Sequence, residues 1–409
     1  MQNVFLVSDV YLYVIGVAII LRLAPTQKLR TVLLILSNLF ILTFLASYRE
    51  IIIATLAYAV LCIAFAEGLY RFRDKGFAKA VTLGCSIAVL AVVVLGLKYP
   101  VYSRIIFGGL AAKAPGLGFE WIGLSFLTFR AIDLIVYYGS GRAKAVRFDS
   151  ALAYLTFFPT FVAGPINRFE QFDENLDQPS PRLSLTEIRD CTLRASIGII
   201  KMTLLARIAW QGSTINTFDL GSSSGLSALF GLYLYYFYIY LDFSGYCDVA
   251  ISVGRLMGFR IPENFNFPFL AVNIQEFWNR WHSSLTAWCR DYIFFVTLRL
   301  QLLKLKAIPR TIALAISMFI TFCFMGAWHG DAVNWLLYGV YHGIGMITWY
   351  TYQKVMEGAM PRFYDKLSGN VFYSAASAFV TFNFVAIGLV LTFDLPKATY
   401  ILHRLAEFV

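Results

Sequence analysis

The sequence predicts an all-α, polytopic membrane protein, and composition and hydropathy are the two observations behind this prediction. Of the 409 residues, 59% are hydrophobic and only 14% are charged, whereas soluble domains carry about 25% charged residues. Apolar runs recur from one end of the chain to the other, and several approach the roughly 20 residues that a helix needs to cross a bilayer. We therefore expect one membrane domain over residues 1–409.

The apolar runs are the candidates for membrane-spanning helices. The clearest are residues 10–23, 31–46, 51–66, 80–97, 121–138, 226–241, 311–325, 335–350 and 375–391. Two further runs, 195–209 and 288–303, bring the predicted number of transmembrane helices to about 9–11. The most polar segment, 173–187, contains two prolines. We expect it to be a solvated loop ahead of a helix that begins near Thr186.

Two stretches, 153–172 and 257–278, are too broken by proline and glycine to span a membrane as single helices. The first contains Pro159, Gly164 and Pro165, and the second contains Pro262 and Pro268. Irregular backbone at membrane depth persists only where it is buried in protein or lines a water-filled cavity. Both stretches are therefore predicted to be re-entrant or cavity-lining segments.

Basic residues predict the orientation of the chain. The net charge is +10, and most Lys and Arg residues lie in short loops between apolar runs, as is typical of cytoplasmic loops. Loops 22–30, 71–79 and 141–147 are rich in basic residues, as is the cluster of Arg299, Lys304, Lys306 and Arg310. We expect all four in the cytoplasm, the N-terminus outside, and the protein in the cell inner membrane. With no nucleic-acid-binding motif present, the charge is not assigned to a nucleic-acid partner.

The histidines are the candidate functional residues of this sequence. The four histidines are His282, His329, His342 and His403. His282 lies in the polar stretch EFWNRWHSSLTAWCRDYIFF (276–295), and His329 lies in FMGAWHGD at the end of an apolar run. Ionisable groups in a membrane region are costly, and they suggest a functional site by default. Each could instead be a structural histidine bonded to a backbone carbonyl, and the residues alone leave both interpretations open.

The neighbours of these histidines lead to further expectations. Ser283 or Ser284 is expected to cap the helix after His282, and Gly326 and Gly330 are expected to leave room for a substrate beside His329. His342 lies in the middle of an apolar run, one turn after Tyr338, and is expected to pack rather than react. Among the charged residues of the polar stretch, Arg280, Arg290 and Asp291 have ion pairing as their structural interpretation.

The absence of other motifs narrows the chemistry. The chain contains no GxSxG, HExxH or GxxxxGK[ST] motif, and its six cysteines form no CxxC pair. We therefore expect no metal ion and no permanently bound cofactor. A buried imidazole is favoured in its neutral form, which can take a proton from a hydroxyl group. This favours acyl transfer to an alcohol.

The stretch EFWNRWHSSLTAWCRDYIF, together with FMGAWHG, resembles the membrane-bound O-acyltransferase (MBOAT) family. The resemblance extends to GLSFLTFRAID, FFPTFVAGPINRFEQF, YLDFSGYCDVAISVGRLMGF and PENFNFPF, so residues 120–345 carry the family motifs. It implies transmembrane helices around a central tunnel, with His329 as the catalytic base and His282 as the second active-site histidine. The residues then expected to contact substrate are Trp278, Asn279, Arg280, Trp281 and Trp328, with Trp288 as a further apolar wall that excludes water.

Within that family the chain is similar to the branch that transfers D-alanine. The resemblance implies that D-alanine arrives as a thioester on the phosphopantetheine arm of a small acidic acyl carrier protein. It then passes to a hydroxyl of an envelope polymer such as teichoic acid, or of a lipid-linked acceptor, in contact with membrane lipids. The alternatives are an O-acetyltransferase of an exported polysaccharide, a lipid or polymer transporter, and a non-catalytic partner subunit.

Overall fold

The structure is a computed structural model that describes residues 8–45, 49–99, 123–143, 145–178, 183–213, 224–304 and 308–407. Within these ranges the chain is helical apart from its loops and one isolated bridge, between Phe265 and Trp281. The predicted all-α class is therefore confirmed. The chain folds into two compact units, Met1–Ile197 with Cys247–Pro262, and Gly198–Tyr246 with Glu263–Val409.

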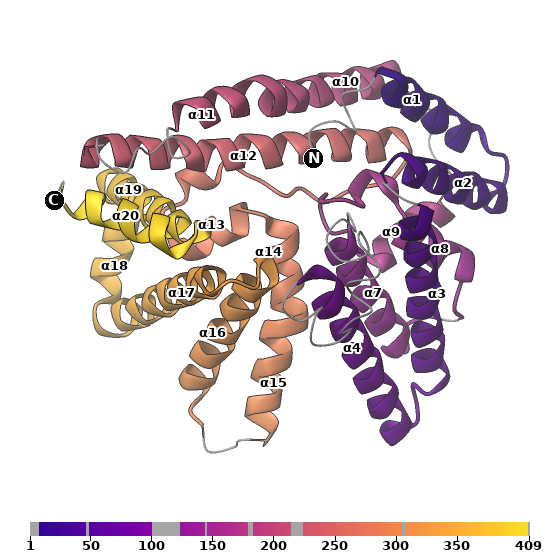
Figure 1. Cartoon of the computed structure of the whole chain (residues 1–409). Helices are drawn as coiled ribbons and strands as arrows, with labels where there is room; N and C mark the ends of the chain where they lie inside the picture. The colour runs from indigo at the N-terminus through magenta and orange to yellow at the C-terminus, as the bar shows by residue number, and fades with distance from the viewer. Residues whose placement is uncertain are drawn as a thin grey trace. The chain divides into compact units, whose positions relative to one another are not determined.

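The first unit contains the N-terminal helices and the end of one long helix (Figure 1). Its helices are α1 (Ser8–Leu23), α2 (Gln27–Leu45), α3 (Arg49–Arg71), α4 (Gly76–Lys98), α7 (Leu124–Gly139), α8 (Phe148–Leu155), η1 (Phe158–Thr160), α9 (Phe169–Asp177) and most of α10 (Leu185–Ile200). The long helix, α12 (Gly225–Leu256), contributes its last turns to this unit. Helices α3 and α7 pack closely on each other, and α8 packs on α2.

The second unit holds most of α12 and everything that follows residue 262. Its elements are η2 (Lys201–Leu205), α11 (Ala206–Gly212), η3 (Pro268–Leu270), α13 (Ile274–Arg280), α14 (Ser283–Cys289), η4 (Arg290–Phe294), α15 (Phe295–Lys304), α16 (Arg310–His329), α17 (Val333–Ala359), α18 (Pro361–Ser368), α19 (Val371–Gly388), η5 (Leu389–Thr392) and α20 (Leu395–Ala406). The most extensive helix pairing in the described chain is between α16 and α17.

All the predicted apolar runs coincide with helices, although positions 46, 121 and 122 of these runs lie outside the described residues. Six helical segments of the described chain are long and apolar enough to cross a membrane: Gln27–Phe44, Arg49–Arg71, Gly76–Lys98, Gly225–Leu256, Arg310–His329 and Val371–Thr392. Their large apolar side chains face outward in places, as at Phe77 and Phe372, which are 85% and 87% exposed. The chain is a multi-pass membrane protein. The predicted central tunnel stays a prediction.

The broken stretch 153–172 has its irregular backbone buried in protein, as expected. It forms the end of α8, the short η1 helix, an extended segment and the start of α9. The Arg130 side chain of α7, only 1% exposed, satisfies carbonyl groups where α8 ends. Its Nη1 donates to the backbone oxygens of Tyr154 at 3.2 Å and of Leu155 and Phe157 at 3.3 Å. Backbone groups without helical partners are thus paired away from lipid.

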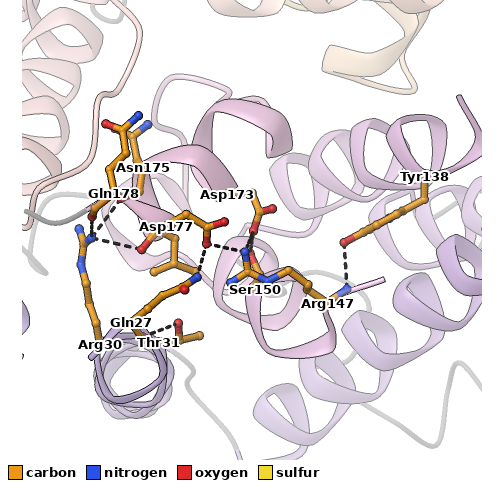
Figure 2. A network of polar contacts seen from close by, with 11 residues as sticks. Gln27, Arg30, Thr31, Tyr138, Arg147, Ser150, Asp173, Asn175, Asp177 and Gln178 are labelled. Atoms are coloured by element: carbon orange, nitrogen blue, oxygen red, sulfur yellow. Dashed lines mark hydrogen bonds and ion pairs between the residues drawn. The ribbon is translucent and has the colours of Figure 1, made fainter. Parts of the chain in front are cut away.

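A second buried arginine satisfies the end of α9 (Figure 2). Arg30 of α2 is 4% exposed, and its Nη1 donates to the backbone oxygens of Asn175 at 3.0 Å and Gln178 at 2.9 Å. The last carbonyls of a helix have no partner within that helix. Arg30 supplies one from a segment about 145 residues away in the sequence.

The carboxylates of α9 complete this network (Figure 2). Arg147 Nη1 lies 3.1 Å from Asp173 and 2.5 Å from Asp177, and Asp173 also accepts a hydrogen bond from Ser150. The expectation that 173–187 is a solvated loop is therefore wrong for residues 173–177, which belong to α9 because these long-range partners hold them there. The next helix begins at Leu185, in agreement with the predicted start near Thr186.

Candidate active site

His282 joins the short helices α13 and α14 in the second unit. Its backbone has a φ of 44°, in the left-handed region that non-glycine residues seldom adopt. His282 occupies the position before the first residue of α14, so the expectation that Ser283 or Ser284 caps this helix is wrong. The two serine hydroxyls instead donate at 2.8 Å to Glu263 O and Asn264 Oδ1. Strained backbone of this kind persists only where its surroundings enforce it.

The tautomer of His282 follows from its contact with Asn264. The backbone N–H of Ser284 donates to Asn264 Oδ1 at 3.1 Å, and since an N–H only donates, that side-chain atom is the amide oxygen. His282 Nδ1 lies 3.2 Å from the same oxygen. Nδ1 must therefore carry the proton, and the lone pair of the neutral ring lies on Nε2. Nothing in the stretch PENFNFPF distinguishes Asn264 from Asn266 as the residue that does this.

His329 is the last residue of α16, and its tautomer is set in the same way. Its Nδ1 lies 2.6 Å from the backbone oxygen of Met325 one turn earlier, and a carbonyl oxygen only accepts. The lone pair of neutral His329 is thus on Nε2. The ring stacks on Trp335, with centroids 5.3 Å apart and planes at 12°. The C-terminal end of a helix carries partial negative charge, which stabilises an imidazolium formed there.

The two histidines lie close enough to interact electrostatically. His282 is 5% exposed, and its ring meets Phe243 edge-on at 4.8 Å. Burial lowers the pKa of His282 to about 3, and the nearby His329 acts in the same direction. His282 is accordingly neutral at physiological pH. The structure therefore brings together the two histidines that the sequence singled out, 47 residues apart in the chain.

Gly326 and Gly330 do not open space beside His329, and that expectation is wrong. A Cβ atom on Gly326 would lie 2.3 Å from the backbone oxygen of Trp335 and 2.9 Å from the backbone nitrogen of Gly339. A Cβ on Gly330 would lie 2.2 Å from Cδ1 of Trp335. The glycines instead let α16 and α17 approach closely, as small residues do between membrane helices.

Of the residues expected to contact substrate, two lie against histidine rings and one is exposed. Trp278 is buried against the ring of His342 at 5.0 Å, and Trp328 meets His329 at 4.6 Å. By contrast Asn279 is exposed.

The other members of that set are held by neighbours in the same unit. Trp281 stacks on Phe277 at 5.6 Å. Arg280 pairs with Glu276 at 2.6 Å, which fits its interpretation as an ion-pairing residue. The assignment of these residues to substrate stays a prediction.

His342 is the residue of this region that sequence reasoning assigned to packing alone. It is fully buried on α17, and its ring lies 4.5 Å from that of Tyr338, which also meets His329 at 6.2 Å. A histidine in the middle of an apolar run was the only signal in the sequence, and helical spacing does not reveal which other helices surround it.

The imidazole rings of the histidines are the groups of this site that could take part in a reaction. In the described part of the chain no group of three or more His, Cys, Asp or Glu residues is placed to hold a metal ion. His282 and His329 each donate a proton from Nδ1 to an oxygen and direct the basic Nε2 elsewhere. A neutral imidazole with a fixed tautomer suits general-base catalysis, and the partly buried aromatic surroundings reduce competition from water.

Comparison with known proteins identifies the family of this chain. Residues 139–393 match the membrane-bound O-acyltransferase family, MBOAT. The chain is 32% identical over 287 residues to the teichoic acid D-alanyltransferase of Streptococcus thermophilus, covering 66% of this chain and 68% of that protein. It is 29% identical over 346 residues to the protein of the same name from Bacillus subtilis, covering 82% and 84%. The probable alginate O-acetylase AlgI of Pseudomonas aeruginosa is 33% identical over 285 residues, covering 66% and 48%. The chain belongs to the membrane-bound O-acyltransferase family and is an O-acyltransferase.

Proposed function

We propose that this enzyme transfers D-alanine from a carrier-protein thioester to a hydroxyl group of a cell-envelope polymer, with His329 as the base. The observation that carries the mechanism is the 2.6 Å contact of His329 Nδ1 with the Met325 carbonyl oxygen, which leaves Nε2 as the proton acceptor. The neutral His282 beside it is the second active-site histidine. Trp328 supplies an apolar wall against the ring of His329, and Trp278 supplies one against the nearby ring of His342.

The proposed reaction needs one proton acceptor and one good leaving group. The hydroxyl of the acceptor gives its proton to His329 Nε2 while its oxygen attacks the thioester carbonyl carbon. A carbon–oxygen bond forms, the carbon–sulfur bond breaks, and the proton on His329 returns to the departing sulfur. The products are the D-alanyl ester and the free phosphopantetheine thiol of the carrier. The helix end at His329 stabilises the transient imidazolium.

The D-alanyl group is favoured by the lengths over which the relatives match. The chain covers 68% and 84% of two proteins named teichoic acid D-alanyltransferase, but 48% of a probable alginate O-acetylase. O-acetylation of a polysaccharide is the second candidate because that acetylase match is also 33% identical. A transporter or a non-catalytic subunit has less support, since the relatives are named as enzymes.

The proposal also covers the acyl donor and the side of the membrane on which it binds. No cofactor is needed in the protein itself, because the phosphopantetheine arm of a small acidic carrier protein brings the acyl group. In the cell inner membrane, such a carrier would meet the basic cytoplasmic cluster at Arg299, Lys304 and Arg310; Lys306, also expected there, lies outside the described residues. The acceptor is teichoic acid or a lipid-linked intermediate on the outer side.

The proposal is tested by His329→Ala in proteoliposomes supplied with D-alanyl-loaded carrier. We expect transfer to fall by about 10²–10⁴-fold, the usual contribution of a positioned base. Loss of thioester and gain of ester on the acceptor are both followed. His403→Ala is the matched control, because the His403 side chain is 72% exposed on α20. A folded His329→Ala protein with near wild-type transfer would refute the mechanism, and transfer of acetyl but not D-alanyl groups by the wild-type protein would refute the substrate.

A further inference from the structure

His342 presents two buried nitrogen atoms without hydrogen-bond partners. The residue is 0% exposed on α17, and in the described part of the chain neither Nδ1 nor Nε2 has a partner. A neutral imidazole has one donor and one acceptor nitrogen, and leaving both unsatisfied in the interior costs stability. A buried polar group of this kind calls for an explanation, and a ligand that supplies the missing bond is one.

A second unsatisfied polar atom lies beside this ring. Trp278 is 3% exposed, and its indole Nε1, which only donates, also lacks a partner among the described residues. The Trp278 ring meets His342 edge-on, with centroids 5.0 Å apart. Aromatic rings occupy other sides of His342, with Tyr338 at 4.5 Å and Phe384 at 5.7 Å. Two helices, α13 and α17, thus place polar atoms together within an aromatic enclosure.

This enclosure adjoins the proposed base. The ring of Tyr338 contacts both His342 at 4.5 Å and His329 at 6.2 Å. His342 also lies within electrostatic range of His329. Tyr338 is thus a single side chain that connects the enclosure to the proposed base.

The chemistry of the enclosure suits an amino group. A neutral imidazole can accept an N–H bond, and surrounding aromatic rings attract an ammonium group. In a D-alanyl thioester the amino group sits on the carbon next to the reacting carbonyl, whereas an acetyl group has no polar substituent there. Since no carboxylate pairs with His342 among the described residues, the buried imidazole would be charged only at high cost, and in its neutral form it accepts rather than repels a cation.

We propose that His342 binds the α-amino group of the aminoacyl substrate and thereby distinguishes D-alanine from acyl groups that lack an amine. The proposal rests on the D-alanyl transfer proposed above and names a specificity residue for it. Trp278 contributes its indole N–H to the same polar spot, where a carbonyl oxygen of the acyl donor is the matching acceptor. His342 takes no proton from the acceptor hydroxyl and is not itself a base in the transfer.

The test compares two carriers that differ only in the amino group. One carrier bears D-alanyl and the other bears propionyl, which has the same carbon skeleton without the amine. Transfer from each is measured with the full-length wild-type protein in proteoliposomes and with His342→Leu. The wild-type protein is expected to prefer D-alanyl by at least about tenfold in kcat/KM, as one buried charged hydrogen bond provides. His342→Leu is expected to lose this preference by slowing D-alanyl transfer while propionyl transfer stays within about twofold.

A structural role for His342 predicts a different pattern. If His342→Leu slows both transfers equally, or changes neither, the proposal is overturned. Tyr341→Phe is the packing control, since it keeps the ring that lies 5.4 Å from that of His342 and removes neither a nitrogen atom nor an aromatic ring, and it should preserve the preference. If the leucine variant does not fold, His342→Gln keeps an acceptor and should retain part of the preference.

The wild-type measurement is decisive without any variant. Equal transfer of D-alanyl and propionyl groups would overturn the role of His342 and leave D-alanyl transfer standing. Absence of all D-alanyl transfer would instead overturn the proposed function itself, so the two failures are distinguishable.

Discussion

Replacing Gly326 by alanine tests whether the position of His329 depends on the close approach of α16 and α17. The added Cβ would lie 2.3 Å from the backbone oxygen of Trp335, whereas ordinary contact begins at 3.4 Å. The obstacle is backbone of the neighbouring helix, with the backbone nitrogen of Gly339 at 2.9 Å on the same side. Side-chain rotation cannot relieve either contact, so the two helices must separate by about 1 Å.

Such a shift moves His329, which lies one turn after Gly326 at the end of α16. A misplacement of about 1 Å in a catalytic constellation can cost about 10²-fold in rate. Overpacking of this kind typically costs about 1–3 kcal/mol in stability. We therefore expect Gly326→Ala to remain in the membrane with a lowered Tm and to transfer D-alanine about 10²-fold more slowly.

The assay is D-alanyl transfer in proteoliposomes alongside thermal unfolding of the purified protein. Gly358→Ala is the matched control, because it lies on α17 and a Cβ there meets nothing within 4 Å. Alanine is the better helix former by about 0.5–1 kcal/mol, so this control should be neutral or stabilising. A Gly326→Ala protein with unchanged Tm and unchanged transfer would show that the helices absorb the methyl group and that the reasoning fails.

Three further predictions concern a hydrogen bond of the site, a buried arginine and the orientation of the chain. Asn264→Leu removes the oxygen that fixes the Nδ1 proton of His282, so the rate of transfer should fall by about tenfold or more. Asn264→Asp keeps an oxygen and should retain more activity, so equal losses in the two variants would contradict this role. Arg30→Met should lower Tm by a few degrees, because the hydrogen bonds of Arg30 to the end of α9 are lost. Reduced protection of α9 against a protease would report the same loss, and an unchanged Tm would contradict the role of Arg30. A cysteine at position 75, in a background without the natural cysteines, should resist an impermeant reagent in intact cells, and labelling there would reverse the predicted orientation.

The sequence by itself determined the helices and the histidines worth examining. The predicted apolar runs coincide with helices because a segment that crosses lipid must be long, apolar and internally hydrogen-bonded. His282 and His329 stood out because an ionisable group in such a chain is costly. The breaks near Pro159 and Pro268 were likewise visible, since proline cannot continue a helix interior.

Only the tertiary structure decided how those groups are used. The tautomer of His282 depends on Asn264, 18 residues away, and the end of α9 depends on Arg30, 145 residues away. Gly326 looked like open space but is a helix contact, and His342 looked satisfied by packing but its nitrogen atoms find no partner among the described residues. The physical reason is common to all four cases: a hydrogen bond or a van der Waals contact is set by distance in space, and local sequence patterns carry no record of which distant segment supplies the partner.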